Sequence, residues 1–298
     1  MSADSAGVIH NIGYRAYEGS RLGRAEILRA LTWHSLRGAF GFGRGAKAKV
    51  VPLITFVLMC LPALVDAAII ALSSQHARQI SYDTYLPSLR ILVLIIFIAT
   101  QAPEVVSRDL RSHTLPLYFA RPIERIDYPV AKLAAFIAAL LAMIEIPLLL
   151  LYLGTVVQLH SGSAIWHETS ALLPGLALGA AWALVLAGLG LLLASLSGRR
   201  AYATGAVAIF FLLTLTLAKL LVQIAGQPGG GGAGLANGAG LISPFTVLDG
   251  LRQWLGGTSH GIVPDPGGAG PLYALMFVVF CAAGIGGLVA RYRKVGVA

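Results

Sequence analysis

Three charged residues lie within stretches that are otherwise apolar: Asp66, Glu145 and Lys219. A charge at the centre of a bilayer costs about 2.5–3.5 kcal/mol on insertion scales, so each of them needs a structural or functional reason. Asp66 and Lys219 each follow the start of their apolar stretch by 16 residues, which places both about 24 Å along a helix. We expect either an ion pair between them or two side chains that extend separately towards the same membrane surface.

Glu145 lies near the middle of its apolar stretch, two residues before Pro147. It is a candidate to line a polar pathway, to bind a cationic group of a substrate or to carry a proton. The structural alternatives are a protonated carboxyl group or a hydrogen bond to a Ser, Thr or Tyr on a neighbouring helix. The sequence leaves both kinds of role open.

The residue groups that an enzyme needs are not brought together anywhere in the sequence. Four of the seven histidines lie outside the bilayer at scattered positions and form no cluster: His76, His160, His167 and His260. The glycine run at 229–232 is not followed by Lys-Ser or Lys-Thr, so it is not a phosphate-binding loop and is interpreted as a flexible linker. Cys60 and Cys281 lie inside apolar stretches, which favours small core residues over a disulfide or a metal site. We therefore expect a chain that is not an enzyme and binds no cofactor or metal itself.

The composition indicates a membrane protein. Of the 298 residues, 57% are apolar and 12% are charged, whereas soluble domains average about 45–50% and about 25%. A hydrocarbon core of ~30 Å requires about 20 apolar residues as helix. Six stretches meet this need, at 50–72, 86–101, 130–158, 171–195, 203–224 and 271–290. The predicted fold is all-α, with six transmembrane helices in one permease domain at 49–298.

The orientation follows from the basic residues. Eighteen Lys and Arg fall in the leader at 1–48 with the adjoining Lys49, in alternate loops and in the tail, against three on the other side. This bias predicts that both termini are cytoplasmic. The net charge of +9 is thus explained by lipid headgroups and topology, and we expect no nucleic-acid partner.

Two segments outside the spans have patterns of their own. Residues 24–42 mix apolar residues with arginines, which predicts an interfacial amphipathic helix on the inner leaflet, with Trp33 at headgroup depth. A helix packed on a soluble partner is the alternative, and the glycines at 41, 43 and 45 supply the bend into the first span.

Residues 226–270 are expected to face outward. Within them, Ser243-Pro244 can begin a short re-entrant or interfacial helix that carries Leu248, Leu251 and Trp254 towards the membrane. Earlier in the chain, Gly175 and Gly179 have a small-xxx-small spacing, which we attribute to close helix packing within one subunit.

The loop at 102–132 is too long for a plain turn between two helices. Charged residues alternate with leucines in its first half, which predicts a short amphipathic helix beneath the bilayer that presents an apolar edge to a cytoplasmic partner. The charged residues of this pattern are Glu104, Arg108, Asp109 and Arg111, and the apolar residues are Leu110, Leu115, Leu117 and Phe119.

This loop resembles that of the type-2 ABC exporter permeases. In that family the loop has an acidic residue, a Thr-Leu pair, Arg-Pro-Ile, a further basic residue, a Tyr and a Lys. The matching residues here are Glu104, Thr114-Leu115, Arg121-Pro122-Ile123, Arg125, Tyr128 and Lys132. The end of the fourth span, LASLSGRRAYATG, and the Ser243-Pro244 segment are also similar, so the resemblance covers most of 50–298. His113 stands where the family usually has Gly.

The resemblance implies a permease subunit that pairs with a second permease, identical or related, and docks two copies of a cytoplasmic ABC ATPase. ATP and Mg²⁺ would bind those partners, and the loop segment 104–125 would act as the coupling helix. The residues that would make this contact are Glu104, Arg108, Asp109, Arg111, Thr114, Leu115, Arg121, Pro122, Ile123 and Arg125. It further implies export of an amphipathic or lipid-like substrate across a bacterial inner membrane. A non-transporting membrane subunit that transmits ATPase motion to another protein is the alternative.

Overall fold

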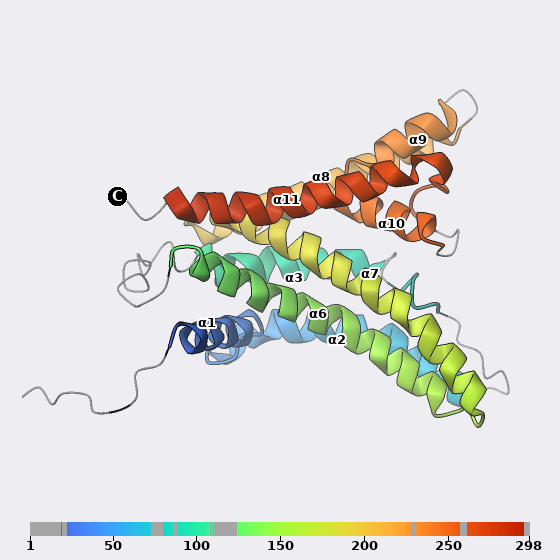
Figure 1. Cartoon of the computed structure of the whole chain (residues 1–298), viewed down its shortest axis with the longest axis horizontal. Coiled ribbons are helices and arrows are strands. Elements are labelled where there is room, and N and C mark those ends of the chain that lie inside the picture. Colours follow the sequence, from blue (N-terminus) through green and yellow to red (C-terminus); the bar gives the residue numbers. More distant parts are fainter. Residues whose placement is uncertain are drawn as a thin grey trace, which may run out of the picture.

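The computed structural model describes residues 19, 23–72, 80–85, 89–107, 109, 124–227, 231–256 and 261–294. These residues form an all-helical bundle in which the described part of the chain contains no β-strand (Figure 1). The helices are α1 (Arg24–Ala39), α2 (Ala46–Leu72), α3 (Leu89–Val105), α6 (Asp127–Val156), α7 (Gly162–Ser195), α8 (Arg200–Ala225), α9 (Gly232–Gly240), α10 (Pro244–Trp254) and α11 (Gly270–Lys294), with a 3-10 turn at Gly267–Ala269.

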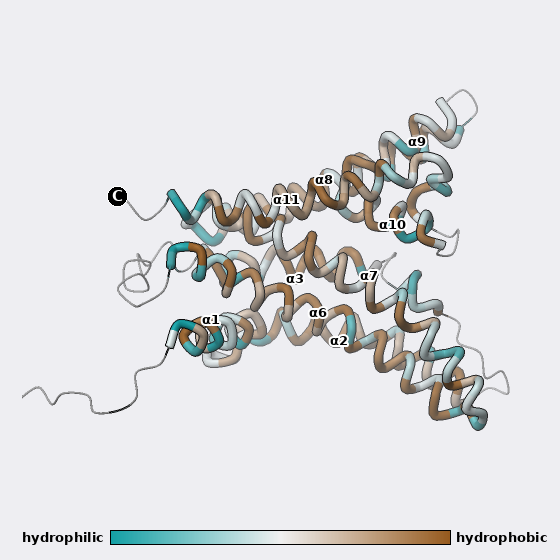
Figure 2. The backbone as a smooth tube through the Cα atoms, in the orientation of Figure 1, coloured by the Kyte–Doolittle hydropathy of each residue, from teal (hydrophilic) through white to brown (hydrophobic). Residues whose placement is uncertain are grey.

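The long helices run side by side and give the bundle two ends (Figure 1). The end that carries α1, the starts of α6 and α8 and the end of α11 is called the leader end. The opposite end, with α9, α10 and the start of α7, is called the far end. Figure 2 shows apolar residues along the middle of the bundle and hydrophilic residues at both ends. This distribution is that of a protein whose central layer lies in lipid.

Each of the six predicted spans corresponds to one long helix. Among the described residues, five helices are long and apolar enough to cross a membrane: α2, α6, α7, α8 and the helix over Gly267–Lys294. The sixth, α3, has 17 residues and extends about 25 Å. It packs against α2, α7 and α8 inside the bundle.

The helix α7 begins nine residues earlier than the sequence predicted. Its first two turns contain polar residues and precede the apolar stretch at 171–195. These residues are held by tertiary contacts: the Tyr82 hydroxyl donates to Glu168 at 2.7 Å, and the Tyr152 and Thr169 hydroxyls lie 2.8 Å apart. Because these hydrogen bonds satisfy the polar side chains, the helix continues into the polar region.

The bend between α1 and α2 is formed by glycine, as predicted. Gly41 and Gly43 have φ angles of 76° and 81°, a region that only glycine adopts readily. A Cβ on Gly41 would also lie 2.5 Å from the carbonyl oxygen of Ala48. The helix α1 packs on α6 and α3 along the side that carries Leu31 and Ala39, and Trp33 on its other side is 62% exposed.

The prediction for α10 was correct in its start and wrong in its environment. Ser243 caps the helix by accepting a hydrogen bond from the backbone of Phe245, and Pro244 occupies the first turn. Leu248 and Leu251 are buried inside the protein instead of facing the membrane. The reason is aromatic packing: the Phe245 ring lies 5.3 Å from that of Trp182 on α7 and 5.6 Å from that of Phe211 on α8. Trp254 covers Gly270 at the start of α11.

The glycines of α7 pack against neighbouring helices of the same chain, which confirms the interpretation of the small-residue spacing. Gly175 contacts Leu148, and Gly179 contacts Ile144, both on α6. Gly188 meets Gly284 of α11, where the two backbones approach most closely: a Cβ on Gly284 would lie 2.7 Å from the Gly188 carbonyl carbon. Close backbone approach is how helices gain packing energy in lipid.

We predict that Gly284→Ala destabilises the protein because the new methyl group must push α7 and α11 apart. Overpacking of this kind costs about 1–3 kcal/mol. The measurement is the apparent free energy of unfolding in mixed micelles. Gly286→Ala on the same helix is the matched control, since a Cβ there meets nothing within 4 Å. Equal stability of the two variants would contradict the predicted contact.

Candidate functional site

The leader end is held together by ion pairs that converge on the two ends of the predicted coupling loop. The first centre is Glu104, in the last turn of α3, whose side chain is 9% exposed. One of its oxygens accepts from Arg44 in the bend after α1, and the other lies 2.5 Å from Arg200 at the start of α8. Arg44 also donates to the carbonyl oxygen of Gly38. A single carboxylate thus links the leader, α3 and α8.

The second centre is Asp109, a short way beyond α3. Its Oδ2 lies 2.7 Å from the Lys132 ammonium and accepts a hydrogen bond of 2.7 Å from the Tyr128 hydroxyl. Both partners belong to the first turns of α6, and the Lys132 side chain is only 6% exposed. The Tyr128 ring packs 5.2 Å from that of Tyr292 near the end of α11. Asp109 therefore connects the outgoing side of the loop to its returning side.

A third contact joins α1 to the returning side of the loop. Arg24 binds Asp127 at 2.6 Å and Glu124 at 2.5 Å. The hydrogen bond to Asp127 raises the pKa of Arg24 above its ordinary value. On the outgoing side, Ser107 donates to the carbonyl oxygen of Ala194 near the end of α7. Both sides of the loop are thus anchored to the bundle.

The structure describes three of the ten residues predicted for the coupling contact. Glu104 and Asp109 lie in the ion-pair centres, and Arg125 is exposed in the turn before α6. Seven lie outside the described residues: Arg108, Arg111, Thr114, Leu115, Arg121, Pro122 and Ile123. The partners Arg44 and Arg200 were not predicted, because nothing in the sequence indicates which basic residue at this end meets Glu104.

The three intramembrane charges are not brought together. Asp66 is buried on α2, and Lys219 is exposed on α8 beside Thr216 and Gln223. The ion pairs between described residues do not include an Asp66–Lys219 pair. The structure therefore does not bear out the first of the two alternatives for these residues.

Glu145 lies on α6 against the glycine surface of α7. Its Oε1 would be 2.6 Å from a Cβ on Gly179, so the glycine provides the space for the carboxyl group. Its Oε2 is buried and has no hydrogen-bond partner among the described residues. A bond to a neighbouring Ser, Thr or Tyr is thus not observed in this part of the chain, and the functional roles of Glu145 stay hypotheses.

A polar cluster at the far end was missed by the sequence analysis. Arg252 on α10 binds Asp83 at 2.9 Å and Asp249 at 3.1 Å. Asp249 also accepts hydrogen bonds from the backbone N–H groups of Ile262 and Val263. The i, i+3 spacing of Asp249 and Arg252 was visible, but their burial depends on α10 entering the bundle, which the sequence did not indicate. We call Asp83, Asp249 and Arg252 the far-end triad.

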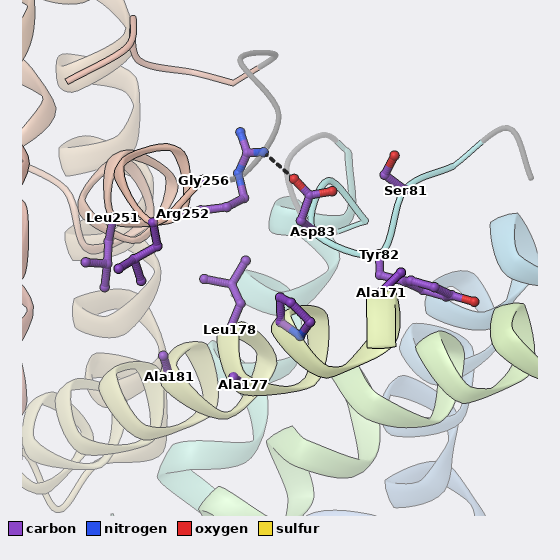
Figure 3. A pocket seen from close by; sticks show the side chains of 12 residues that line it. Ser81, Tyr82, Asp83, Ala171, Ala177, Leu178, Ala181, Leu251, Arg252 and Gly256 are labelled. Atoms are coloured by element: carbon purple, nitrogen blue, oxygen red, sulfur yellow. Dashed lines mark hydrogen bonds and ion pairs between the residues drawn. The ribbon is translucent and has the colours of Figure 1, made fainter. Parts of the chain in front are cut away.

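A cavity of about 450 Å³ adjoins this triad (Figure 3). It lies between α7, α10 and the segment 80–85, and Asp83 and Arg252 point toward one another across its rim. Its other walls are mainly aliphatic. The chain was also compared with known protein families and with curated proteins, and neither comparison found a match.

We predict that Glu104→Gln destabilises the leader end, because the substitution leaves two guanidinium groups without their shared charge. Loss of such a partly buried partner costs about 1–3 kcal/mol. The measurement is the midpoint of thermal unfolding in a mild detergent. Glu26→Gln is the matched control, because Glu26 is exposed and bonds to the backbone of Gly23 at the cap of its own helix. An equal shift for both variants would show that the Glu104 ion pairs carry no stability.

Proposed function

We propose that this chain is the membrane-spanning permease subunit of an ATP-driven exporter of the type-2 ABC kind. In this proposal six helices cross the membrane, α2, α3, α6, α7, α8 and α11. The leader end faces the cytoplasm, where a separate ATPase docks on the loop between α3 and α6. The substrate is an amphipathic or lipid-like molecule.

The support comes from the loop pattern of the sequence together with the arrangement of the leader end. The basic leader, both sides of the loop, the start of α8 and the end of α11 gather at one end of the bundle (Figure 1). The positive-inside bias of Lys and Arg supports a cytoplasmic location for this end. A partner that approaches from that side would meet the loop first.

The observation that carries the proposal is the double ion pair of Glu104. It lies in the last turn of α3, at the start of the predicted coupling segment 104–125, and binds both Arg44 and Arg200. A force applied to the loop therefore acts on the leader and on α8 as well as on α3. The Asp109 contacts extend the same connection to α6.

The mechanism follows from this connection. Closure of two nucleotide-binding subunits on ATP would shift the coupling segment, and the ion pairs would pass the shift to the ends of several long helices. Rigid helices transmit such a displacement along their length, so that paired bundles change between inward-open and outward-open arrangements. No nucleotide-binding loop is needed in this chain.

We predict that cysteines at positions 29 and 293 lie on the same side of the membrane. The measurement is labelling with a membrane-impermeant maleimide in intact and permeabilised cells, in a background with Cys60 and Cys281 replaced by Ala. The two variants are Arg29→Cys and Arg293→Cys, both at exposed positions. With an even number of spans both cysteines lie on the cytoplasmic side, so each should be labelled only after permeabilisation. Asp265→Cys, labelled in intact cells, is the control. Labelling of 29 and 293 on opposite sides would mean that α3 does not cross.

We also predict that the tagged chain, purified from its native membranes, carries an ATPase subunit with a Gly-Lys-Ser or Gly-Lys-Thr phosphate loop. Reversal of the loop charges, Arg121→Glu with Arg125→Glu, should reduce the recovered ATPase at least tenfold. The matched control is Arg293→Glu with Lys294→Glu, which makes the same charge change on exposed residues at the same end.

Two results would contradict the proposal. One is the absence of any such ATPase from repeated preparations, and the other is equal recovery with both double variants. Flux of substrate in vesicles that contain the assembled complex then distinguishes the exporter from a subunit that only transmits motion, since the latter retains ATPase activity without flux.

A further inference from the structure

The cavity at the far end has two kinds of wall. One side is built by aliphatic side chains of α7 and α10, and the rim is polar (Figure 3). The aliphatic residues are Ala171, Ala177, Leu178, Ala181, Leu251 and Leu255. Its volume of about 450 Å³ is within the ~300–1,000 Å³ that small-molecule sites occupy. Mixed walls of this kind suit a molecule with an apolar body and one polar group.

The charges at the rim determine which polar group is favoured. The far-end triad has two carboxylates and one guanidinium, so its net charge is negative. The Asp83 side chain is 19% exposed, whereas those of Arg252 and Asp249 are 2% and 0% exposed. A ligand in the cavity would therefore meet the carboxylate more readily than the guanidinium.

A further carboxylate lies close to the same segment. Tyr82, which neighbours Asp83 and lines the cavity, donates its hydroxyl hydrogen to Glu168 on α7. Charge–charge interactions are stronger beside aliphatic walls than in water, because the local dielectric constant is lower. Among the described residues at and beside the cavity, carboxylates thus outnumber cations, and this balance favours a cation over an anion.

We propose that this cavity is a binding site for a hydrophobic organic cation, with the charge near Asp83 and the apolar body against Leu178 and Leu251. The inference goes beyond the proposed function, because binding requires neither the ATPase nor transport. It concerns the far end alone, so a negative result for cation binding would not contradict the proposed function, and the absence of an ATPase would not contradict cation binding.

The test is binding of tetraphenylphosphonium to the purified full-length chain in dodecyl maltoside, measured by equilibrium dialysis. Tetraphenylborate has the same shape and the opposite charge, and it serves as the charge control. We expect saturable binding of the cation, and binding of the borate that is at least tenfold weaker. Equal binding of both ions, or no saturable binding of the cation, would overturn the proposal.

Two variants locate the site. Asp83→Asn removes the accessible charge and should weaken cation binding at least tenfold, whereas Asp265→Asn, an exposed control outside the cavity, should leave it unchanged. Leu178→Phe fills the apolar part and should weaken binding to a similar degree, whereas Leu173→Phe on the exposed side of the same helix should not.

Size-exclusion profiles establish that each variant is folded. If Asp83→Asn does not fold, the comparison of Leu178→Phe with Leu173→Phe is sufficient to test the site, because neither substitution changes a charge of the far-end triad. Cation binding that is unaffected by Leu178→Phe would place the ligand elsewhere and refute the site.

Discussion

The Glu104 carboxylate is the interaction on which the leader end depends. Each of its oxygens takes one guanidinium group, from Arg44 and from Arg200. The side chain is largely removed from water, so these charges interact more strongly than they would on an open surface. Loss of the carboxylate would remove at once the contact of α3 with the bend after α1 and its contact with the start of α8.

The far end is built on the inverse arrangement, with one guanidinium between two carboxylates. Arg252 connects α10 to the segment 80–85, and Tyr82 of that segment is bound to α7 through Glu168. The helix α7 has 34 residues and extends about 51 Å, so it reaches both ends. Ala194 near its last turn accepts a hydrogen bond from Ser107 at the leader end. A rigid displacement of α7 would therefore move its contacts at both ends, with Tyr82 at the far end and with Ser107 at the leader end.

The difference between what the sequence predicted and what it did not has a physical basis. Helix existence follows from local apolar content, so a helix was found at each of the six predicted stretches, five of them long and apolar enough to cross a membrane. The Gly41 and Gly43 bend and the Ser243 cap were found from local residue preferences. The ion pairs join residues that are 60 and 169 positions apart, as for Arg44 with Glu104 and Arg252 with Asp83. Such partners depend on tertiary packing that one sequence does not reveal. The burial of α10 depends on the rings of Trp182 and Phe211 for the same reason.

The two ends together also bear on the energy source. If the far-end cavity holds a cation and the leader end is cytoplasmic, the membrane potential opposes outward movement of that cation by about 2.3 kcal/mol per charge per 100 mV. A bundle that only changed shape spontaneously would let such a cation accumulate inside. Outward transport of such a cation then requires an energy source, and the described charges at the ends of the loop are those around Glu104 and Asp109 and the contact of Arg24 with Asp127 and Glu124. If the cavity holds a cation that the protein exports, the energy for export must come from a coupled source, and in the proposed function that source is the ATPase at the leader end.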